Sequence, residues 1–179
     1  MSVEAFYENI LPEHLVDPIK AYITSRRAVY TPVRQEYVGD LYRSVEIFRP
    51  QNGHPMEEHV IKSMLYFNNE YFNYDLCGTF EVQVLKYHAN DGFKWHCDYG
   101  VSENPEAERK LSMTLQLSGE RDYEGGELDI IDWYNREHSL SKQYGSFIVF
   151  DSRVPHRVRP VTKGLRYSVV AWAHGPQLR

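Results

Sequence analysis

The sequence predicts a mainly β protein, with a jelly-roll-like core and helices packed on one face of it. Apolar residues recur at helical spacing in the first part of the chain, whereas from about residue 74 onward they recur at every second position. The strand-like runs follow one another without helices between them, which favours an antiparallel barrel or sandwich. Because 179 residues suit one domain, we expect a single domain over 1–179, with a helical layer at about 1–73 and a jelly-roll core at about 74–176.

Two segments of the first part are predicted to be helices. In residues 12–25, apolar side chains recur at helical spacing at Leu15, Ile19, Tyr22 and Ile23. Pro18 interrupts this pattern, so we expect the helix to begin there, with Asp17 as its N-cap and Pro18 at its first position. Residues 56–69 form the second helix, with acidic residues in the first turn and an apolar face made of Val60, Ile61, Met64 and Leu65.

Five short apolar runs predict the strands of the core: 79–87 (TFEVQVLKY), 111–117 (LSMTLQL), 126–131 (GELDII), 146–150 (SFIVF) and 166–173 (RYSVVAWA). The first two alternate between apolar and polar residues, as a strand with one buried face does. The glycines of EGGEL (124–128) predict a hairpin and serve backbone geometry. Residues 99–110 are polar and unpatterned, and they predict a loop that is either a lid or an unconstrained surface segment.

Composition disfavours several classes of protein. The formal net charge of -5 disfavours a general binder of nucleic acid or of anionic membranes. No apolar run is long enough to span a bilayer, and the N-terminus lacks the basic start and apolar run of a signal peptide. Two cysteines give neither a disulfide framework nor a zinc-type pair. We therefore expect a cytoplasmic protein without a membrane partner.

The stretch KWHCDYG (94–100) contains a candidate pair of metal ligands. In a strand, residues two apart point to the same side, so His96 and Asp98 face one point while Cys97 faces away. A His-x-Asp pair alone is unspecific, and a third ligand must come from elsewhere. His156 is the best candidate, because it follows an apolar strand and a polar turn and precedes another strand. Two histidines and one carboxylate form the ligand set of non-haem iron(II) oxygenases.

The other six histidines lack such surroundings. Four are interpreted as surface residues: His14, His54, His59 and His138. The other two, His88 and His174, are interpreted as ordinary residues at strand ends. None of them is expected to bind metal.

Arg166 lies inside an otherwise apolar strand. A buried arginine requires an anionic partner, which is either a structural carboxylate or the carboxylate of a ligand. Arg166 follows His156 by one strand step, and its planar guanidinium suits bidentate capture of a carboxylate. Ser168 points to the same side and can add a hydrogen bond.

Four stretches together resemble the iron(II)- and 2-oxoglutarate-dependent dioxygenase superfamily, in its prolyl 4-hydroxylase-like branch. They are VLKYHANDGFKWHCD, YEGGELDI, GSFIVFDSRVPHRVRPV and KGLRYSVVAW, and they run from about Phe80 to His174. The resemblance implies a double-stranded β-helix, the jelly roll of this superfamily. It also implies that Fe(2+) and 2-oxoglutarate are bound, that O2 is the second co-substrate, and that ascorbate is a candidate reductant.

The resemblance implies a role for particular residues. His96, Asp98 and His156 would bind the iron, while Arg166, assisted by Ser168, would bind the distal carboxylate of 2-oxoglutarate. Tyr87 would contact the co-substrate. The substrate pocket would include Trp172, Tyr99 and Arg153. The sequence departs from many prolyl hydroxylases at the second co-substrate tyrosine, where it has Leu115 or nearby apolar residues.

The implied reaction is hydroxylation of a substrate C–H bond with release of succinate and CO2. A peptidyl proline of a partner protein is the first choice of substrate, and a free amino acid or another small molecule is the alternative. Nucleic acid is disfavoured, because the dealkylating branch has a second arginine where this chain has Trp172. Arg153, Arg157 and Arg159 are expected around the mouth of the site, where they would suit an acidic substrate segment.

Three rival interpretations differ in what they leave unexplained. A cupin-like metal-binding jelly roll without 2-oxoglutarate explains the two histidines and the aspartate but not Arg166. A zinc hydrolase accepts the same ligands, but the chain has no helical His-Glu-x-x-His pattern. A β-sandwich with a coincidental motif does not explain why all the motifs occur together.

Overall fold

The computed structural model describes residues 4–25, 27–37, 40–51, 54–100 and 107–177. Within these ranges the helices are α1 (Glu13–Ile23), α2 (Pro55–Phe67) and the π-helix η1 (Asn68–Phe72). The strands are β1 (Phe6–Ile10), β2 (Thr31–Tyr37), β3 (Asp40–Phe48), β4 (Phe80–Tyr87), β5 (Gly92–His96), β6 (Glu108–Gln116), β7 (Tyr123–Gly125), β8 (Leu128–Ile131), β9 (Glu137–Ser139), β10 (Ser146–Asp151), β11 (His156–Val158), β12 (Val161–Gly164) and β13 (Arg166–Gly175).

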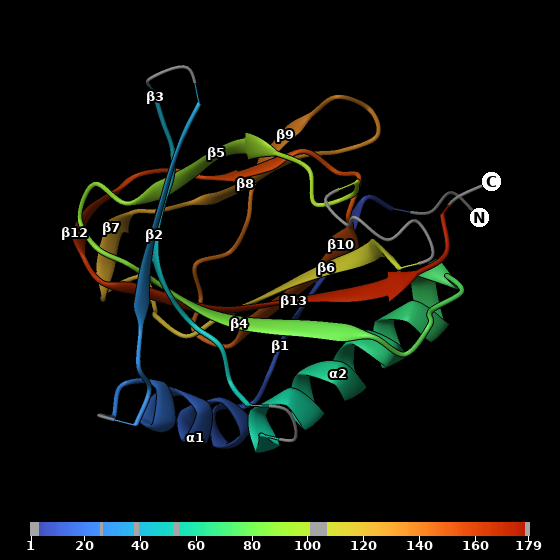
Figure 1. Cartoon of the computed structure of the whole chain (residues 1–179), viewed down its shortest axis with the longest axis horizontal. Coiled ribbons are helices and arrows are strands. Elements are labelled where there is room, and N and C mark those ends of the chain that lie inside the picture. Colours follow the sequence, from blue (N-terminus) through green and yellow to red (C-terminus); the bar gives the residue numbers. More distant parts are fainter. Residues whose placement is uncertain (1–3, 26, 38–39, 52–53, 101–106, 178–179) are drawn as a thin grey trace.

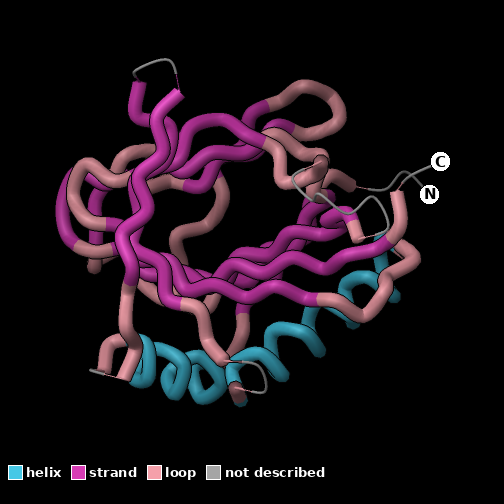
Figure 2. The backbone as a smooth tube through the Cα atoms, viewed as in Figure 1, coloured by secondary structure: helices cyan, strands magenta, loops and turns pink. Residues whose placement is uncertain are grey.

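An antiparallel sheet curls over on itself and has α1 and α2 along one outer face (Figures 1 and 2). The strand order is β1-β10-β6-β13-β4-β3-β5-β11-β8-β9, with β2 attached to β3 and a separate pair of β12 and β7. Figure 1 shows β5, β8 and β9 above β4, β6 and β13. The predicted class, a mainly β jelly roll with helices on one face, is confirmed. None of the helices in the described ranges is long and apolar enough to cross a membrane.

The curl gives the central strands two buried faces. On β6, Leu111, Met113 and Leu115 pack toward the helices, together with residues of α1, α2, β4 and β13. The alternate residues Ser112 and Thr114 are also buried, although they are polar. They face the hollow between the two layers, because the upper strands cover that side. The predicted alternation is therefore correct, but its polar side lines an internal space and not the solvent.

Helix α1 begins earlier than the sequence predicts. It starts at Glu13 with Pro12 as its N-cap, so Pro18 lies inside it. Packing explains the difference, because Val16, Ile19 and Ile23 together form one buried face. The carbonyl group that Pro18 leaves without its helical partner is that of His14, an exposed residue, so water can bind it.

Asp17 also differs from the prediction, because it lies inside α1 and not at its N-cap. Its carboxylate accepts a hydrogen bond from the Tyr144 hydroxyl at 2.8 Å. The side chain therefore joins the helix to the loop before β10.

Helix α2 is confirmed as a helix, but its buried face is shifted. Met56, Val60 and Met64 are buried, whereas Leu65 is 38% exposed. Phe67 extends the same face and stacks on Phe147 of β10, with ring centroids 5.6 Å apart.

The segment 1–73 is not a helical layer alone, because it also supplies β1, β2 and β3 to the main sheet. Strand β1 pairs with β10, and β3 pairs with both β4 and β5. On β3, Val45 and Ile47 are buried on one face, whereas Ser44 and Phe48 are buried on the other, with the half-buried Glu46 between them. The apolar and β-branched residues of SVEIF are a strand signal in the sequence.

Two predicted connections are also corrected. Of the predicted loop 99–110, residues Glu108–Lys110 belong to β6, and the interpretation of 101–106 as a lid lies outside the described residues. Residues 124–128 do not form a hairpin, because β7 and β8 belong to different sheets. The glycines do serve backbone geometry: Gly126 has φ 64°, and a Cβ there would lie 2.8 Å from Val161 and 3.2 Å from the Arg166 side chain.

Candidate active site

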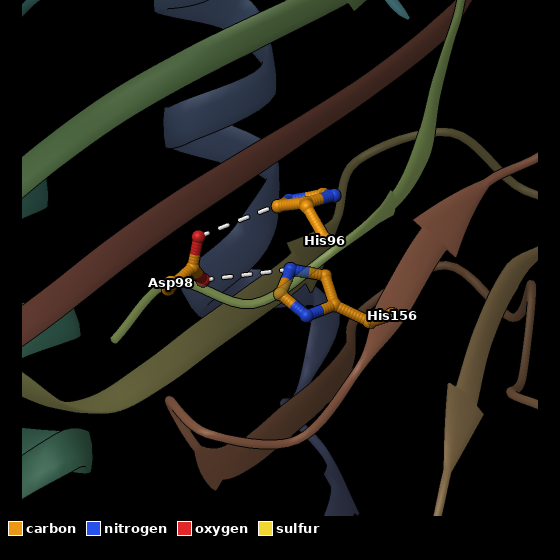
Figure 3. A group of neighbouring side chains, drawn as sticks. All are labelled: His96, Asp98 and His156. Carbon is orange, nitrogen blue, oxygen red and sulfur yellow. Dashed lines mark ion pairs between the residues drawn. The ribbon is translucent and has the colours of Figure 1, made fainter. Parts of the chain in front are cut away.

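Two strands and one turn bring three potential ligands together (Figure 3). His96 is the last residue of β5 and His156 the first of β11, and the two lie opposite each other in the strand pairing. Asp98 lies just beyond β5. The Ser152 carbonyl, in the turn before β11, accepts hydrogen bonds from the N–H groups of Asp98 and Tyr99, both at 2.9 Å. The turn therefore holds Asp98 beside the two histidines.

The three side chains converge on one point. The Asp98 carboxylate lies 3.8 Å from Nε2 of His96 and 3.4 Å from Nε2 of His156. Nδ1 of His96 lies 2.7 Å from the Lys94 carbonyl, and Nδ1 of His156 lies 3.0 Å from the Val154 carbonyl. Because a carbonyl only accepts, Nδ1 carries the proton in both rings and Nε2 presents its lone pair inward. This is the orientation in which imidazole binds a metal.

The electrostatics of the cluster favour the metal-binding protonation states. Burial and the neighbouring His156 lower the pKa of His96 well below its ordinary value, so the ring is neutral at pH 7. Burial alone would raise the pKa of Asp98, but the positive charge of His156 or His96 in its protonated form outweighs it and lowers this pKa. The Ser112 hydroxyl also donates to Asp98 at 2.7 Å. A neutral imidazole and an ionised carboxylate are the forms that bind metal.

Arg166 is buried without a carboxylate partner. It is 1% exposed, and its guanidinium donates to the Ser168 hydroxyl at 3.1 Å and lies 5.3 Å from the centre of the Tyr87 ring. Its Nε has no hydrogen-bond partner, and no acidic residue of the described ranges forms an ion pair with it. A buried and unpaired cation is costly. The pocket therefore suits an anionic ligand.

One pocket joins Arg166 to the three converging ligands. Besides these four residues, its walls include Tyr87, Ser168, Thr114, Val158, Val170 and Trp172. Tyr87 is 1% exposed. The structure thus brings Tyr87, Ser168 and Trp172 together in the wall of one pocket.

The position expected to hold an apolar residue in place of a second tyrosine holds a polar residue, Gln116. Leu115 packs toward the helices, and the next residue, Gln116, occupies the interior face opposite Ser168. Gln116 is completely buried, and neither its amide oxygen nor its amide nitrogen has a partner. The buried Tyr123 hydroxyl lies beside Arg166, whose hydrogen bond partly offsets the rise in the pKa of Tyr123 that burial causes. The Gln116 amide and the Nε of Arg166, on the paired strands β6 and β13, are therefore buried polar groups without hydrogen-bond partners.

Two predicted pocket residues do not reach this space. A second cavity shares His96, Asp98 and Trp172 with this pocket, and we call it the mouth of the pocket. Neither Tyr99 nor Arg153 lines the pocket or its mouth. Arg153 instead pairs with the buried Asp151, with an N–O distance of 2.6 Å. The Tyr99 ring lies 6.0 Å from the Lys110 ammonium group.

Arg157 and Arg159 are also neutralised. Both bind the buried carboxylate of Asp129, at 2.7 and 2.6 Å, and both bind Glu137. The predicted use of Arg153, Arg157 and Arg159 for an acidic substrate is therefore unsupported, because each has an acidic partner in the protein.

The other histidines lie outside the cluster. Within the described ranges, His96, Asp98 and His156 form the one group of three whose ligand atoms could hold a metal, all within 4.8 Å of one another. His138 and His174 are hydrogen-bonded to the carboxylates of Asp132 and Glu81, and Nε2 of His88 lies 3.2 Å from the Glu46 carboxylate. His174 is buried, unlike an ordinary strand-end residue.

Sequence reasoning missed residues that surround the three ligands. Phe93 stacks on His96, with ring centroids 3.5 Å apart, and Ser112 supports Asp98. Arg43 of β3 lines both the pocket and its mouth. It lies on the same side of β3 as Val45 and Ile47, so an arginine on an apolar side of a strand was the available signal.

Sequence comparison connects this site to a family. The model of the 2OG-Fe(II) oxygenase superfamily matches residues 82–174, more than half of the chain. A PKHD-type hydroxylase of Psychrobacter sp. (strain PRwf-1) is 38% identical over 90 residues, which cover 48% of this chain and 34% of the relative. A PKHD-type hydroxylase of Xylella fastidiosa (strain M12) is 31% identical over 137 residues, which cover 69% and 55%. The chain thus spans about a third to a half of these relatives.

Solved structures share the fold. A Pseudomonas putida prolyl-4-hydroxylase superimposes with a TM-score of 0.78 at 24% identity, covering 96% of this chain and 93% of that one. A Trichoplax adhaerens prolyl hydroxylase, in complex with a hypoxia inducible factor peptide fragment, gives 0.72 at 18% identity, with 96% and 84% covered. The family match, with the fold and the converging ligands, shows that this chain belongs to the 2OG-Fe(II) oxygenase superfamily.

Proposed function

We propose that the protein is an iron(II)- and 2-oxoglutarate-dependent hydroxylase of the prolyl-hydroxylase type. One observation carries the proposal: the inward Nε2 atoms of His96 and His156 and the Asp98 carboxylate share a pocket with Arg166, a buried guanidinium without a carboxylate partner. Two histidines and a carboxylate on one side of a metal suit non-haem iron(II). A cupin-like metal site explains the three ligands but leaves Arg166 without a role.

The residues fit the groups that the family implies, which are Fe(2+), 2-oxoglutarate and O2. His96, Asp98 and His156 would hold the iron, and Ser112 would keep the carboxylate oriented through its hydrogen bond. Arg166 would bind the distal carboxylate of 2-oxoglutarate, because its planar fork matches a carboxylate.

Three polar residues would assist Arg166. Ser168 already accepts a hydrogen bond from the guanidinium, so it holds the side chain in place. Tyr87 lines the same pocket, and Gln116 offers an unpaired amide from the neighbouring strand. These groups would replace the water that surrounds a carboxylate in solution.

Bound iron and 2-oxoglutarate would supply the oxidising power for hydroxylation, in which O2 is consumed and succinate and CO2 are released. The chain itself orients the reactants and excludes water. Leu85, Phe150 and Val158 contribute apolar walls to the pocket. Trp172 borders both the pocket and its mouth, so it would contact the substrate at the metal.

We propose a peptidyl proline as the substrate, with a free amino acid or another small molecule as the alternative. Support comes from the PKHD-type and prolyl hydroxylases that resemble this chain, one of which was solved with a peptide. Ascorbate is proposed as a reductant that keeps the iron in its ferrous state. A search for products heavier by one oxygen atom, in proline peptides and in free amino acids, separates the two substrate classes.

An anaerobic titration tests the chemistry. Adding 2-oxoglutarate to the iron(II)-loaded protein should change the visible absorption of the metal, and aerobic incubation should release succinate. His96→Ala and Asp98→Ala should lose iron binding, whereas His138→Ala serves as the matched control, since His138 binds Asp132 away from the cluster. An unchanged spectrum in the wild-type protein would contradict the oxygenase proposal and favour the cupin-like alternative.

A further inference from the structure

Arg43 is a second arginine that faces the site without an acidic partner. It lies on β3 opposite Phe93 of β5, and it lines both the inner pocket and the mouth. The residue is half-buried, and its buried Nε has no hydrogen-bond partner. No carboxylate in the described part of the chain forms an ion pair with it.

A structural role does not account for this arginine. Its guanidinium lies 4.7 Å from the centre of the Phe93 ring. Stacking on an aromatic ring uses the face of the guanidinium and leaves the N–H groups at its edge without acceptors. Those N–H groups border a space that a ligand can enter.

The mouth of the pocket is distinct from the Arg166 end. It is a cavity of about 240 Å³ whose wall includes His96, Asp98, Trp172 and Arg43 but not Arg166. A molecule at the mouth can therefore contact Arg43 and the metal ligands while 2-oxoglutarate occupies the inner end.

The mouth would carry an uncompensated positive charge once Asp98 binds the metal, because Arg43 would then have no anionic neighbour among the residues that line it. Of the described residues that line it, Asp98 is the one with a carboxylate, and it faces the metal position. Arg109 also lines the mouth and stacks at 4.0 Å on Trp172, although Glu81 neutralises it at 2.9 Å. Gln83 contributes an amide whose buried oxygen has no donor. In a chain of net charge -5, an uncompensated cation at this place indicates a preference for anions.

We infer that Arg43 binds a carboxylate of the substrate beside the metal site. The inference rests on the proposed function and specifies its substrate class, because the substrate must carry an acidic group near the carbon that reacts. Two sources share this chemistry: an acidic side chain next to the target residue of a peptide, and the α-carboxylate of a free amino acid.

Matched probes test the inference on the iron- and 2-oxoglutarate-loaded protein. One arm uses proline peptides with glutamate or glutamine at each position flanking the proline, and the other uses L-proline and L-prolinamide. Binding is followed without oxygen by the change in metal absorption, and product by mass spectrometry. At least one carboxylate probe should bind roughly tenfold more tightly than its amide partner, as a charged hydrogen bond predicts. The arm in which this occurs identifies the source.

Variants at Arg43 decide the assignment. Arg43→Gln should abolish the preference, and Arg43→Lys should retain part of it, because it keeps the charge. Arg121→Gln, at an exposed position, should leave it unchanged. Equal binding of every carboxylate probe and its amide partner overturns the inference, as does a preference that survives in Arg43→Gln.

The response to 2-oxoglutarate separates this inference from the proposed function. If 2-oxoglutarate changes the spectrum of the wild-type protein but no probe preference exists, only the role of Arg43 fails. If Arg43→Gln loses the response to 2-oxoglutarate, Arg43 belongs to the co-substrate site and the substrate inference is overturned. If the wild-type protein gives no response, the proposed function itself fails.

Discussion

Two groups of arginines near the site differ in orientation and in partners. Arg157 and Arg159 extend from β11 and the residues after it, close in sequence to His156, but both bind Asp129 and Glu137. Arg166 and Arg43 face the internal space from β13 and β3, without acidic partners. Proximity to a ligand in the sequence therefore says little about function. An arginine is available to a ligand when its strand points it inward and the protein supplies no carboxylate.

The largest difference between the groups should appear in 2-oxoglutarate affinity. Removing one member of a buried charge pair costs about 2–5 kcal/mol, so Arg166→Ala should weaken 2-oxoglutarate binding by at least about 30-fold. Anaerobic titration of the iron-loaded protein measures this, and iron content should be unchanged. Arg157→Ala is the matched control and should match the wild type. Similar losses in both variants would remove the distinction between the groups.

Removing the hydroxyl that supports the metal ligand Asp98 should have the next largest effect, on iron(II) affinity. The Ser112 hydroxyl donates to Asp98 and also contacts the Ser152 hydroxyl at 2.9 Å. Ser112→Ala should lower iron(II) affinity by about 10–100-fold, as the loss of a group that orients a ligand does. Competition with a chelator measures it. Ser139→Ala, which removes the hydrogen bond to Asp129 instead, should leave iron affinity unaltered.

The paired arginines should matter for stability and not for binding. Asp129→Asn should lower the free energy of unfolding by about 1–3 kcal/mol, because it weakens the interactions of a buried carboxylate with Arg157 and Arg159. Denaturant unfolding measures the loss, while 2-oxoglutarate affinity should be unchanged. A loss of co-substrate binding at constant stability would contradict the structural role.

This loss of stability should depend on pH. Burial alone would raise the pKa of Asp129, but hydrogen bonds from Ser139, Arg159 and Arg157 outweigh it and lower this pKa. A carboxyl group with a lowered pKa contributes stability above its unfolded pKa of about 4 and loses it as the pH falls through the folded value. The wild type and Asp129→Asn should therefore differ most at neutral pH and converge in acid.

The smallest effect is expected at Gln116, where one substitution should weaken 2-oxoglutarate binding without lowering the stability of the fold. Gln116→Leu should weaken 2-oxoglutarate binding by about 2–10-fold, the value of one hydrogen bond. The same change should leave the free energy of unfolding equal or higher, because it removes two buried polar atoms without partners. Titration and denaturant unfolding together test this. A loss of stability without a loss of affinity would show that Gln116 has no role at the Arg166 end.

The sequence predicted the residues whose chemistry leaves a local pattern. His96 and Asp98 share a strand face, and Arg166 stands out in an apolar strand. Arg43 has the same signal on β3, but helical spacing dominates the pattern of residues 1–73, so the prediction there contains two helices and no strands. The partners of Arg153, Arg157 and Arg159 could not be predicted, because strand pairing and turns bring their acidic partners to them. Gln116 was missed because a polar alternation normally indicates solvent, whereas here a second layer covers it.

Gly126 and Arg166 constrain each other across 40 positions of the chain (166 − 126 = 40). A methyl group on residue 126 would lie 3.2 Å from the Cδ atom of Arg166. The two positions should therefore be energetically coupled, so that Gly126→Ala and Arg166→Ala are not additive in a double-mutant cycle. The absence of a Cβ atom at position 126 therefore helps to set the shape of the site around Arg166.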